Sequence, residues 1–105
     1  MLTRNDLEKE FEAEMFRTYE RARVEAGYNA TRFLGMLNEH GGVGTARILI
    51  NSSQVSEGYA ALWMKNRLDL AVEAVIHDNT KWHTLFSEHE LKICSQRLRD
   101  YGYIK

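Results

Sequence analysis

Apolar residues recur at steps of three and four along most of this chain, which is the spacing of amphipathic α-helices. The first and longest stripe predicts a helix that ends at Gly27, a residue type common at helix C-termini. Thr3 or Asn5 can cap its start, with Asp6 or Glu8 as the acidic half of a capping box. The stripe consists of Leu7, Phe11, Met15, Tyr19, Ala22 and Ala26.

A glycine turn separates the next two predicted helices. Asn29 is the expected N-cap of the first of them, and Gly41 ends it. The second is predicted over residues 43–51, directly after Gly42. The apolar positions of the two helices are Phe33, Leu34, Leu37, Ala46, Leu49 and Ile50.

Two more helices and a turn are predicted in the following segment. Ser56 caps one helix, and Asp69 is the expected N-cap of the next, after a tight junction at Asn66 and Arg67. Residues 77–80 have the composition of a loop, and the turn after them is expected to fold back over the core. The apolar positions here are Tyr59, Leu62, Trp63, Val72, Val75, Ile76, Trp82, Leu85 and Phe86.

The last helix has a clear N-terminal signature. Ser87 and Glu90 can form a capping box, and Phe86 and Leu91 occupy the positions of a hydrophobic staple. Gly102 ends the helix. Its apolar stripe is Leu91, Cys94, Leu98 and Tyr101.

These elements predict an all-α fold, a compact single-domain bundle of five to six helices with a Gly-Gly turn between the second and third. No repeat or linker divides the chain, so residues 1–105 are expected to form one domain. The expected core consists of Phe11, Met15, Phe33, Leu37, Leu49, Leu62, Val72, Ile76, Leu91 and Leu98.

Composition narrows the class of protein. The chain has 44% hydrophobic residues, 28% charged residues and no proline, which fits a globular helical domain. A formal net charge of -1 argues against a basic nucleic-acid-binding domain. No apolar run approaches the ~20 residues that cross a bilayer, and the N-terminus lacks a signal-peptide core. With Cys94 as the lone cysteine, we expect a cytoplasmic protein without a membrane anchor.

The titratable residues show no recognisable catalytic constellation. The 4 histidines are scattered, without HExxH spacing and without a cysteine at zinc-ligand spacing. No nucleophile, base and oxyanion site come together in the pattern. We therefore expect neither an enzyme nor a bound metal or cofactor.

Glu73 is a carboxylate in an otherwise apolar run, LAVEAVI. It must point outward or pair with a cation such as Arg67 or Arg47. We interpret Arg67, Asp69 and Glu73 as a structural ion-pair network rather than a catalytic group. Glu12, by contrast, is placed on the charged and solvated face of the first helix.

The glycine turn GGVGTA has three interpretations. It can be a sharp junction between two core helices, or a helix N-terminus that holds an anion, although the lysine of a P-loop is absent. This candidate interaction or anion site consists of Gly41, Gly42, Gly44, Thr45 and Arg47. Residues 31–52 also have the length and form of a helix-turn-helix with Gly41 in the turn, but its second helix offers few groove contacts. They are Arg47, Asn51 and Ser52.

The segments GYNATRFLGML, GGVGTARILI, SEGYAALW, RLDLAVEAVI, LFSEHEL and RLRDYGY together resemble a family of small bacterial helical modules. The resemblance extends from Phe11 to Tyr103. Such modules occur alone or attached to restriction-type and other DNA-processing proteins, so the resemblance implies a bacterial intracellular module linked to phage defence. It transfers no catalytic residues. The positions of interest that it implies are Tyr28, Gly41, Gly42, Arg67, Leu68, Asp69 and Glu73.

Two main functions remain in view, and a small enzyme that acts through an unfamiliar site is a minor third. The first is a non-enzymatic interaction module whose charged helical faces, or an exposed Trp63 or Trp82, bind another protein or a second copy of the chain. The second is a helix-turn-helix-like binder of nucleic acid that acts through residues 38–52. Arg47 separates them, because a groove helix needs its side chain exposed, whereas a structural role pairs it with a carboxylate such as Glu73.

Overall fold

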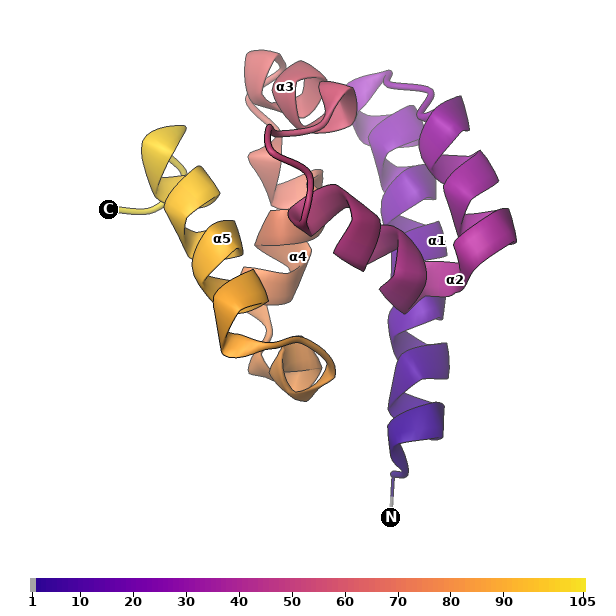
Figure 1. Ribbon diagram of the computed structural model, residues 1–105. Helices are drawn as coiled ribbons and strands as arrows, with labels where there is room; N and C mark the ends of the chain where they lie inside the picture. Colours follow the sequence, from indigo (N-terminus) through magenta and orange to yellow (C-terminus); the bar gives the residue numbers. More distant parts are fainter. Residues whose placement is uncertain (1) are drawn as a thin grey trace.

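The computed structural model describes residues 2–105, and every regular element in that range is helical. Figure 1 shows the helices packed into one body. The all-α fold expected from the sequence is confirmed. The elements are α1 (Arg4–Ala26), α2 (Thr31–Ile50), α3 (Glu57–Met64), η1 (Leu68–Leu70), α4 (Val72–Asp78), η2 (Thr80–Leu85) and α5 (Glu88–Asp100), where η denotes a 3-10 segment.

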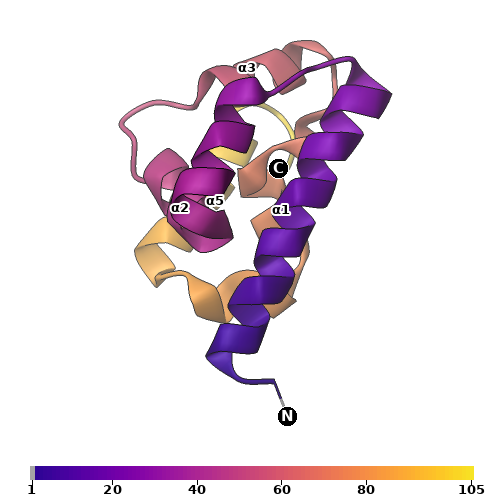
Figure 2. The ribbon, with the colours of Figure 1, turned by 90° about the vertical axis from the view of Figure 1, so that its right-hand side faces the viewer.

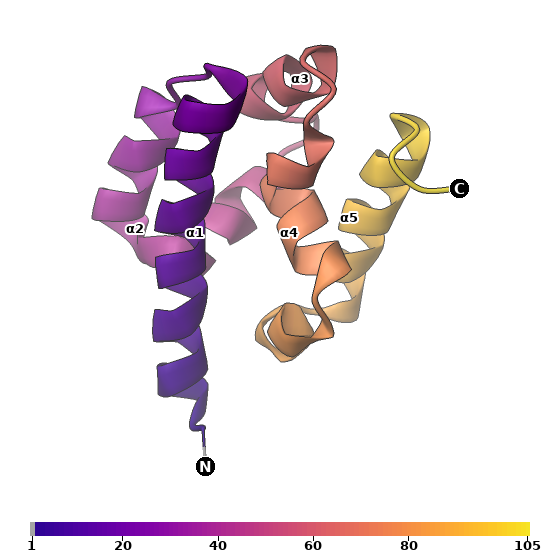
Figure 3. The ribbon, with the colours of Figure 1, turned by 180° about the vertical axis from the view of Figure 1, so that it is seen from behind.

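Two helix pairs make up the body of the fold. The helix α1 packs along α2, and α4 packs along α5. Figure 2 shows α1 beside α2, and Figure 3, from behind, shows α4 between α1 and α5. The short helix α3 lies across one end, while η2 packs against α1 near the other (Figure 1). Across residues 2–105, no helix is long and apolar enough to span a membrane.

Both ends of α1 form as the sequence predicts. The Thr3 hydroxyl accepts the backbone N–H of Asp6 at 3.1 Å, and the Asp6 carboxylate accepts the N–H of Thr3 at 3.2 Å, which completes a capping box. Gly27 ends the helix with a φ of 64°, in the left-handed region that favours glycine.

The helix α2 bends at Gly41, which has φ 74° and ψ 178° and divides α2 into two helical segments. The predicted break between two helices is therefore confirmed. The predicted cap at Asn29 is wrong, because Ala30 precedes the first turn and no side chain caps it. The Asn29 side chain instead accepts a hydrogen bond from the Tyr19 hydroxyl at 3.1 Å, so a tertiary contact with α1 replaces the local cap.

In α3, the cap is confirmed and one inward-facing residue is not. The Ser56 hydroxyl accepts the N–H of Tyr59 at 3.1 Å. Leu62 is buried on the inner face together with Tyr59. Trp63, predicted on the same face, is 47% exposed, and its indole N–H donates to the Tyr101 carbonyl at 3.1 Å.

The start and end of α4 differ from the prediction. Asp69 does not cap this helix, because it lies within η1 and α4 begins only after Ala71. The predicted loop at residues 77–80 is mostly helical, since α4 continues to Asp78 and η2 starts at Thr80. Asn79 separates the two and caps η2 by accepting the N–H of Lys81 at 3.0 Å.

The turn η2 and the start of α5 confirm their predictions. Trp82 and Phe86 are buried edge-on against Phe11, with ring centroids 5.3 and 5.4 Å apart. Ser87 and Glu90 form the expected capping box, with donor–acceptor distances of 2.9 and 3.1 Å. These contacts fix η2 between α1 and α5.

The core follows the apolar stripes. Most of the expected core residues are buried, while Phe33, Leu49 and Leu91 are partly buried and pack against them. The buried members are Phe11, Met15, Leu37, Leu62, Val72, Ile76 and Leu98. Leu49 is only partly covered because it borders the cleft described below.

Candidate functional site

The glycine turn holds a carboxylate of the protein itself. The Glu12 side chain on α1 accepts the backbone N–H of Gly42 at 3.0 Å. This N–H belongs to the start of the second segment of α2, where an external anion would bind. The placement of Glu12 on a solvated face is therefore wrong, because its carboxylate fills the candidate anion position.

Close helix packing explains why glycines occupy the turn. A Cβ on Gly42 would lie 2.7 Å from the Glu12 Cα. A Cβ on Gly41 would lie 2.9 Å from a carboxylate oxygen of Glu12. Of the next two residues of the candidate site, Thr45 is fully buried, while Gly44 is partly buried and a Cβ there would meet only the His40 Cβ of the same helix, at 3.2 Å. These contacts support the interpretation of the turn as a helix junction.

Arg47, the last residue of the candidate anion site, faces away from the turn. Its guanidinium donates to the Leu85 carbonyl at 3.2 Å and lies 3.5 Å from the Glu90 carboxylate. Asn51 donates to the same carboxylate at 2.9 Å. Ser52, just after the end of α2, donates its hydroxyl to the Ile48 carbonyl of that helix. The three proposed groove contacts are thus all engaged in bonds within the chain. Arg47 meets both criteria set from the sequence, because its side chain is 46% exposed and is also paired with a carboxylate, that of Glu90 rather than Glu73.

Arg67 and Asp69 form the predicted ion pair, at 3.0 Å, but Glu73 is not their partner. The third member is Glu25 at the end of α1, whose carboxylate lies 2.7 Å from the Arg67 guanidinium. Arg21 pairs with Glu25 at 2.9 Å and reaches Asp69 at 4.0 Å. This half-exposed network connects the end of α1 to η1.

Glu73 lies in the interior, where its side chain is 2% exposed and pairs with Arg97 of α5 at 2.9 Å. The expected partners, Arg67 and Arg47, are both bound elsewhere. Burial raises the pKa of Glu73, and the hydrogen bonds to its backbone and to Arg97 oppose that rise.

Arg97 also holds the segment that follows α2. Its guanidinium donates to the carbonyls of Leu49, at 3.1 Å, and of Ser52 and Gln54. Glu73 therefore orients a cation that ties α4, α5 and the loop at residues 51–55 together. Charge-assisted bonds of this kind are stronger than neutral ones, so the loop is anchored from inside.

Two other polar groups lie close to this pair. The Tyr59 hydroxyl is buried without a hydrogen-bond partner in residues 2–105, and burial raises its pKa. Burial, together with the charge of Glu73, raises the pKa of the Cys94 thiol to about 12. Cys94 is therefore protonated at neutral pH and is a core residue rather than a reactive thiol.

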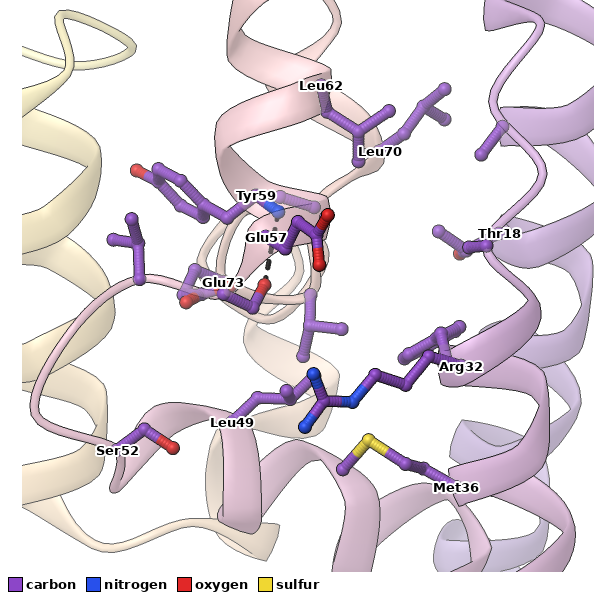
Figure 4. A pocket seen from close by; sticks show the side chains of 18 of the residues that line it. Thr18, Arg32, Met36, Leu49, Ser52, Glu57, Tyr59, Leu62, Leu70 and Glu73 are labelled. Carbon is purple, nitrogen blue, oxygen red and sulfur yellow. Dashed lines mark hydrogen bonds between the residues drawn. The ribbon is translucent and has the colours of Figure 1, made fainter.

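A cleft of about 340 Å³ opens beside this interior region, between α1, α2, the loop at residues 51–56, α3 and the start of α4. Figure 4 shows side chains from these elements around one hollow. Much of the wall is apolar, including Ala22, Phe33, Leu49, Val55, Leu62 and Val72. Ile48, 44% exposed, lies at its edge.

Two charged side chains reach the cleft from different helices. Arg32 comes from the first turn of α2 and Glu57 from the first turn of α3. In Figure 4 their charged groups lie on opposite sides of the hollow. Both residues are exposed, and neither forms an ion pair within residues 2–105.

Comparison with protein-family models, with curated proteins and with solved structures gives no match. Within residues 2–105, no three His, Cys, Asp or Glu side chains are grouped to hold a metal ion. The cleft is therefore the feature of the structure that indicates a function. Sequence patterns did not reveal it, because its walls come from five segments and each contributes ordinary core or rim residues.

Proposed function

We propose that this protein is a non-enzymatic interaction module that binds a short apolar segment of a partner protein in the cleft. The observation that carries the proposal is the open cleft of about 340 Å³, which lies within the range of ligand-binding sites, roughly 300–1,000 Å³. Its apolar wall favours side chains such as leucine, since burying one contributes about 1.5–3 kcal/mol. The unpaired Arg32 at its edge favours a segment that carries a carboxylate.

The other side chains considered from the sequence support this role less well. Trp82 is buried in the core and so has almost no surface that a partner could contact. Trp63 is half-exposed, but its indole already bonds Tyr101. The cleft, by contrast, is apolar, concave and charged at its edge, a combination typical of sites that select one partner.

The alternative function, a helix-turn-helix contact with nucleic acid through residues 38–52, receives less support. Arg47, Asn51 and Ser52 all bond to other groups of the chain. The carboxylate of Glu90 beside Arg47 would also repel a phosphate backbone. A cytoplasmic role in bacterial phage defence or DNA processing remains part of the proposal, and its support is the sequence resemblance.

Selection from a displayed random peptide library tests the proposal, followed by fluorescence anisotropy with the enriched peptides. We expect enriched peptides to contain adjacent apolar residues and an acidic residue. Ile48→Asp should abolish their binding, because it places a charge at the edge of the cleft. Val24→Asp is the matched control, since Val24 is 68% exposed on α1 and does not line the cleft.

Both variants change an exposed aliphatic residue on a helix, so both should keep the melting temperature close to that of the wild type. Equal loss of binding in the two variants, or enrichment of peptides without apolar residues, would contradict the proposal. Light scattering during size exclusion tests whether the partner is a second copy of the chain. A dimer that Ile48→Asp dissociates would identify a second copy of the chain as the partner.

A further inference from the structure

The two charges at the cleft specify more than an apolar partner. We infer that the cleft selects a segment with an apolar anchor between one acidic and one basic residue, and that it binds this segment in one direction. The inference rests on the proposed function and names the chemistry of its partner. It is carried by the placement of Arg32 and Glu57 on opposite sides of the hollow (Figure 4).

The positions of the two residues give the partner a polarity. Arg32 belongs to α2 and Glu57 to α3, so the acidic residue of the segment lies toward α2 and the basic residue toward α3. The anchor enters the apolar part of the cleft lining, which includes Leu49 and Leu62. Charges at the edge of an interface contribute little affinity but fix orientation and exclude wrong partners.

The surroundings of Glu57 support a cationic group on that side. The pKa of the neighbouring Tyr28 is raised, first by burial and then by the charge of Glu57. A Cβ on Gly58 would lie 3.5 Å from the Tyr28 hydroxyl, so this phenol sits directly beside the start of α3. Glu57 therefore adds a negative field to a partly buried neighbourhood, where a basic side chain of the partner is stabilised.

The same arrangement disfavours simpler anionic ligands. A polyanion such as a nucleic acid backbone gains from Arg32 but is repelled by Glu57 across the hollow. A purely cationic segment gains from Glu57 but is repelled by Arg32. A segment with both charges satisfies both residues at once, provided that its charges are separated by the apolar anchor.

Five capped peptides of equal length test the inference. Each carries a Leu-Leu anchor flanked by Glu then Lys, by Lys then Glu, by two Glu, by two Lys or by two Gln. Binding is followed by the amide ¹⁵N–¹H shifts of the wild-type protein. We expect one mixed-charge order to bind about fivefold more tightly than its reverse and than the other three peptides.

A charge-swapped protein gives the sharper readout. The double variant Arg32→Glu with Glu57→Arg keeps the net charge and should prefer the reverse peptide by a similar factor. The matched control is Glu20→Arg with Arg23→Glu, which swaps an exposed ion pair on the outer face of α1. It should keep the wild-type order of preference.

The outcomes separate this inference from the proposed function. If all five peptides shift the cleft amides with equal affinity, the inference and the expected preference for an acidic residue are wrong, but binding of an apolar segment in the cleft stands. If the charge swap leaves the preferred order unchanged, the inference is wrong and the proposed function stands. If no peptide shifts these amides, both are wrong. Tightest binding by the peptide with two Glu or two Lys also contradicts the inference.

Discussion

The Glu12 carboxylate accepts the backbone N–H of Gly42 at 3.0 Å and so joins the middle of α1 to the bend in α2. The two residues meet because Gly42 has no side chain, since a Cβ there would lie 2.7 Å from the Glu12 Cα. The contact explains both the glycine at the turn and the carboxylate opposite it. It lies at the bend after which the second segment of α2 reaches the cleft with Ile48 and Leu49.

Gly42→Ala should destabilise the fold by about 1–3 kcal/mol, because the added methyl group meets backbone atoms that cannot move freely. The matched control is Gly35→Ala in the same helix, where nothing lies within 4 Å of the added Cβ. That substitution should stabilise the protein by roughly 0.5–1 kcal/mol. Urea denaturation measures both free energies of unfolding, and equal effects would refute the close-approach argument.

Removing Glu73 should cost more stability than removing Glu12. Glu73→Ala leaves the largely buried guanidinium of Arg97 without its carboxylate, a loss of about 3–5 kcal/mol for a buried pair. Glu12→Ala removes only a cap, worth about 0.5–2 kcal/mol. Thermal melts of the two variants decide the order, and equal melting temperatures would show that the interior pair does not anchor the fold.

The local signals in the sequence predicted the fold well because caps and stripes act within one or two helical turns. Thr3 and Ser87 cap their helices as expected, since their partners lie three residues away. Asn29 and Asp69 are the same kind of residue but cap no α-helix, because Asn29 bonds Tyr19 of α1, and Asp69 lies within η1 and pairs with Arg67, two residues before it. A cap residue and a tertiary hydrogen-bond partner look alike in one sequence.

The candidate site was harder to predict, because its partners are far apart along the chain. The apolar run around Glu73 indicates that this carboxylate points outward or pairs with a cation, but the cation is Arg97, which lies in a charged stretch of α5 without a distinguishing pattern. Glu12 looked like one more charge on a polar helix face. The cleft depends on how α3 crosses α1 and α2, and periodicity gives the faces of helices but not their crossing.

Arg47→Ala should lower the free energy of unfolding by about 0.5–1.5 kcal/mol, because it removes the bond to the Leu85 carbonyl and the pairing with Glu90.

We expect no measurable binding of wild-type protein to duplex DNA at physiological salt. A mobility-shift titration at micromolar protein checks this expectation. A shift that Arg47→Ala abolishes without lowering the melting temperature would instead favour the helix-turn-helix function.

Acid should weaken the surface network of Glu25, Arg21 and Arg67. Hydrogen bonds from Arg21 and then from Arg67 lower the pKa of Glu25 to about 2. A carboxyl whose pKa is lowered in the folded state stabilises the fold above its ordinary value of 4.5, and this contribution is lost as the pH falls toward about 2. The stability difference between wild type and Glu25→Gln should therefore shrink over that interval.

Glu73→Gln should show the opposite trend and provides the contrast. Burial raises the pKa of Glu73, so the part of the stability that comes from this shift is fully present below 4.5 and is lost as the pH rises through the raised value. Wild type should thus gain stability relative to Glu73→Gln as the pH falls. Denaturation of the wild type and of both variants across pH 2–7 measures the two stability differences. If both differences changed with pH in the same direction, the pKa shifts given to Glu25 and Glu73 would be contradicted.

Intermolecular nuclear Overhauser effects between a bound Leu-Leu peptide and methyl-labelled protein test the central claim most directly. We predict contacts from the peptide methyl groups to Leu49, Leu62 and Val72, which form the apolar wall of the cleft. Val24 and Met64, exposed elsewhere, should show none. Contacts to Val24 or Met64 in place of the cleft residues would show that the cleft is not the binding site.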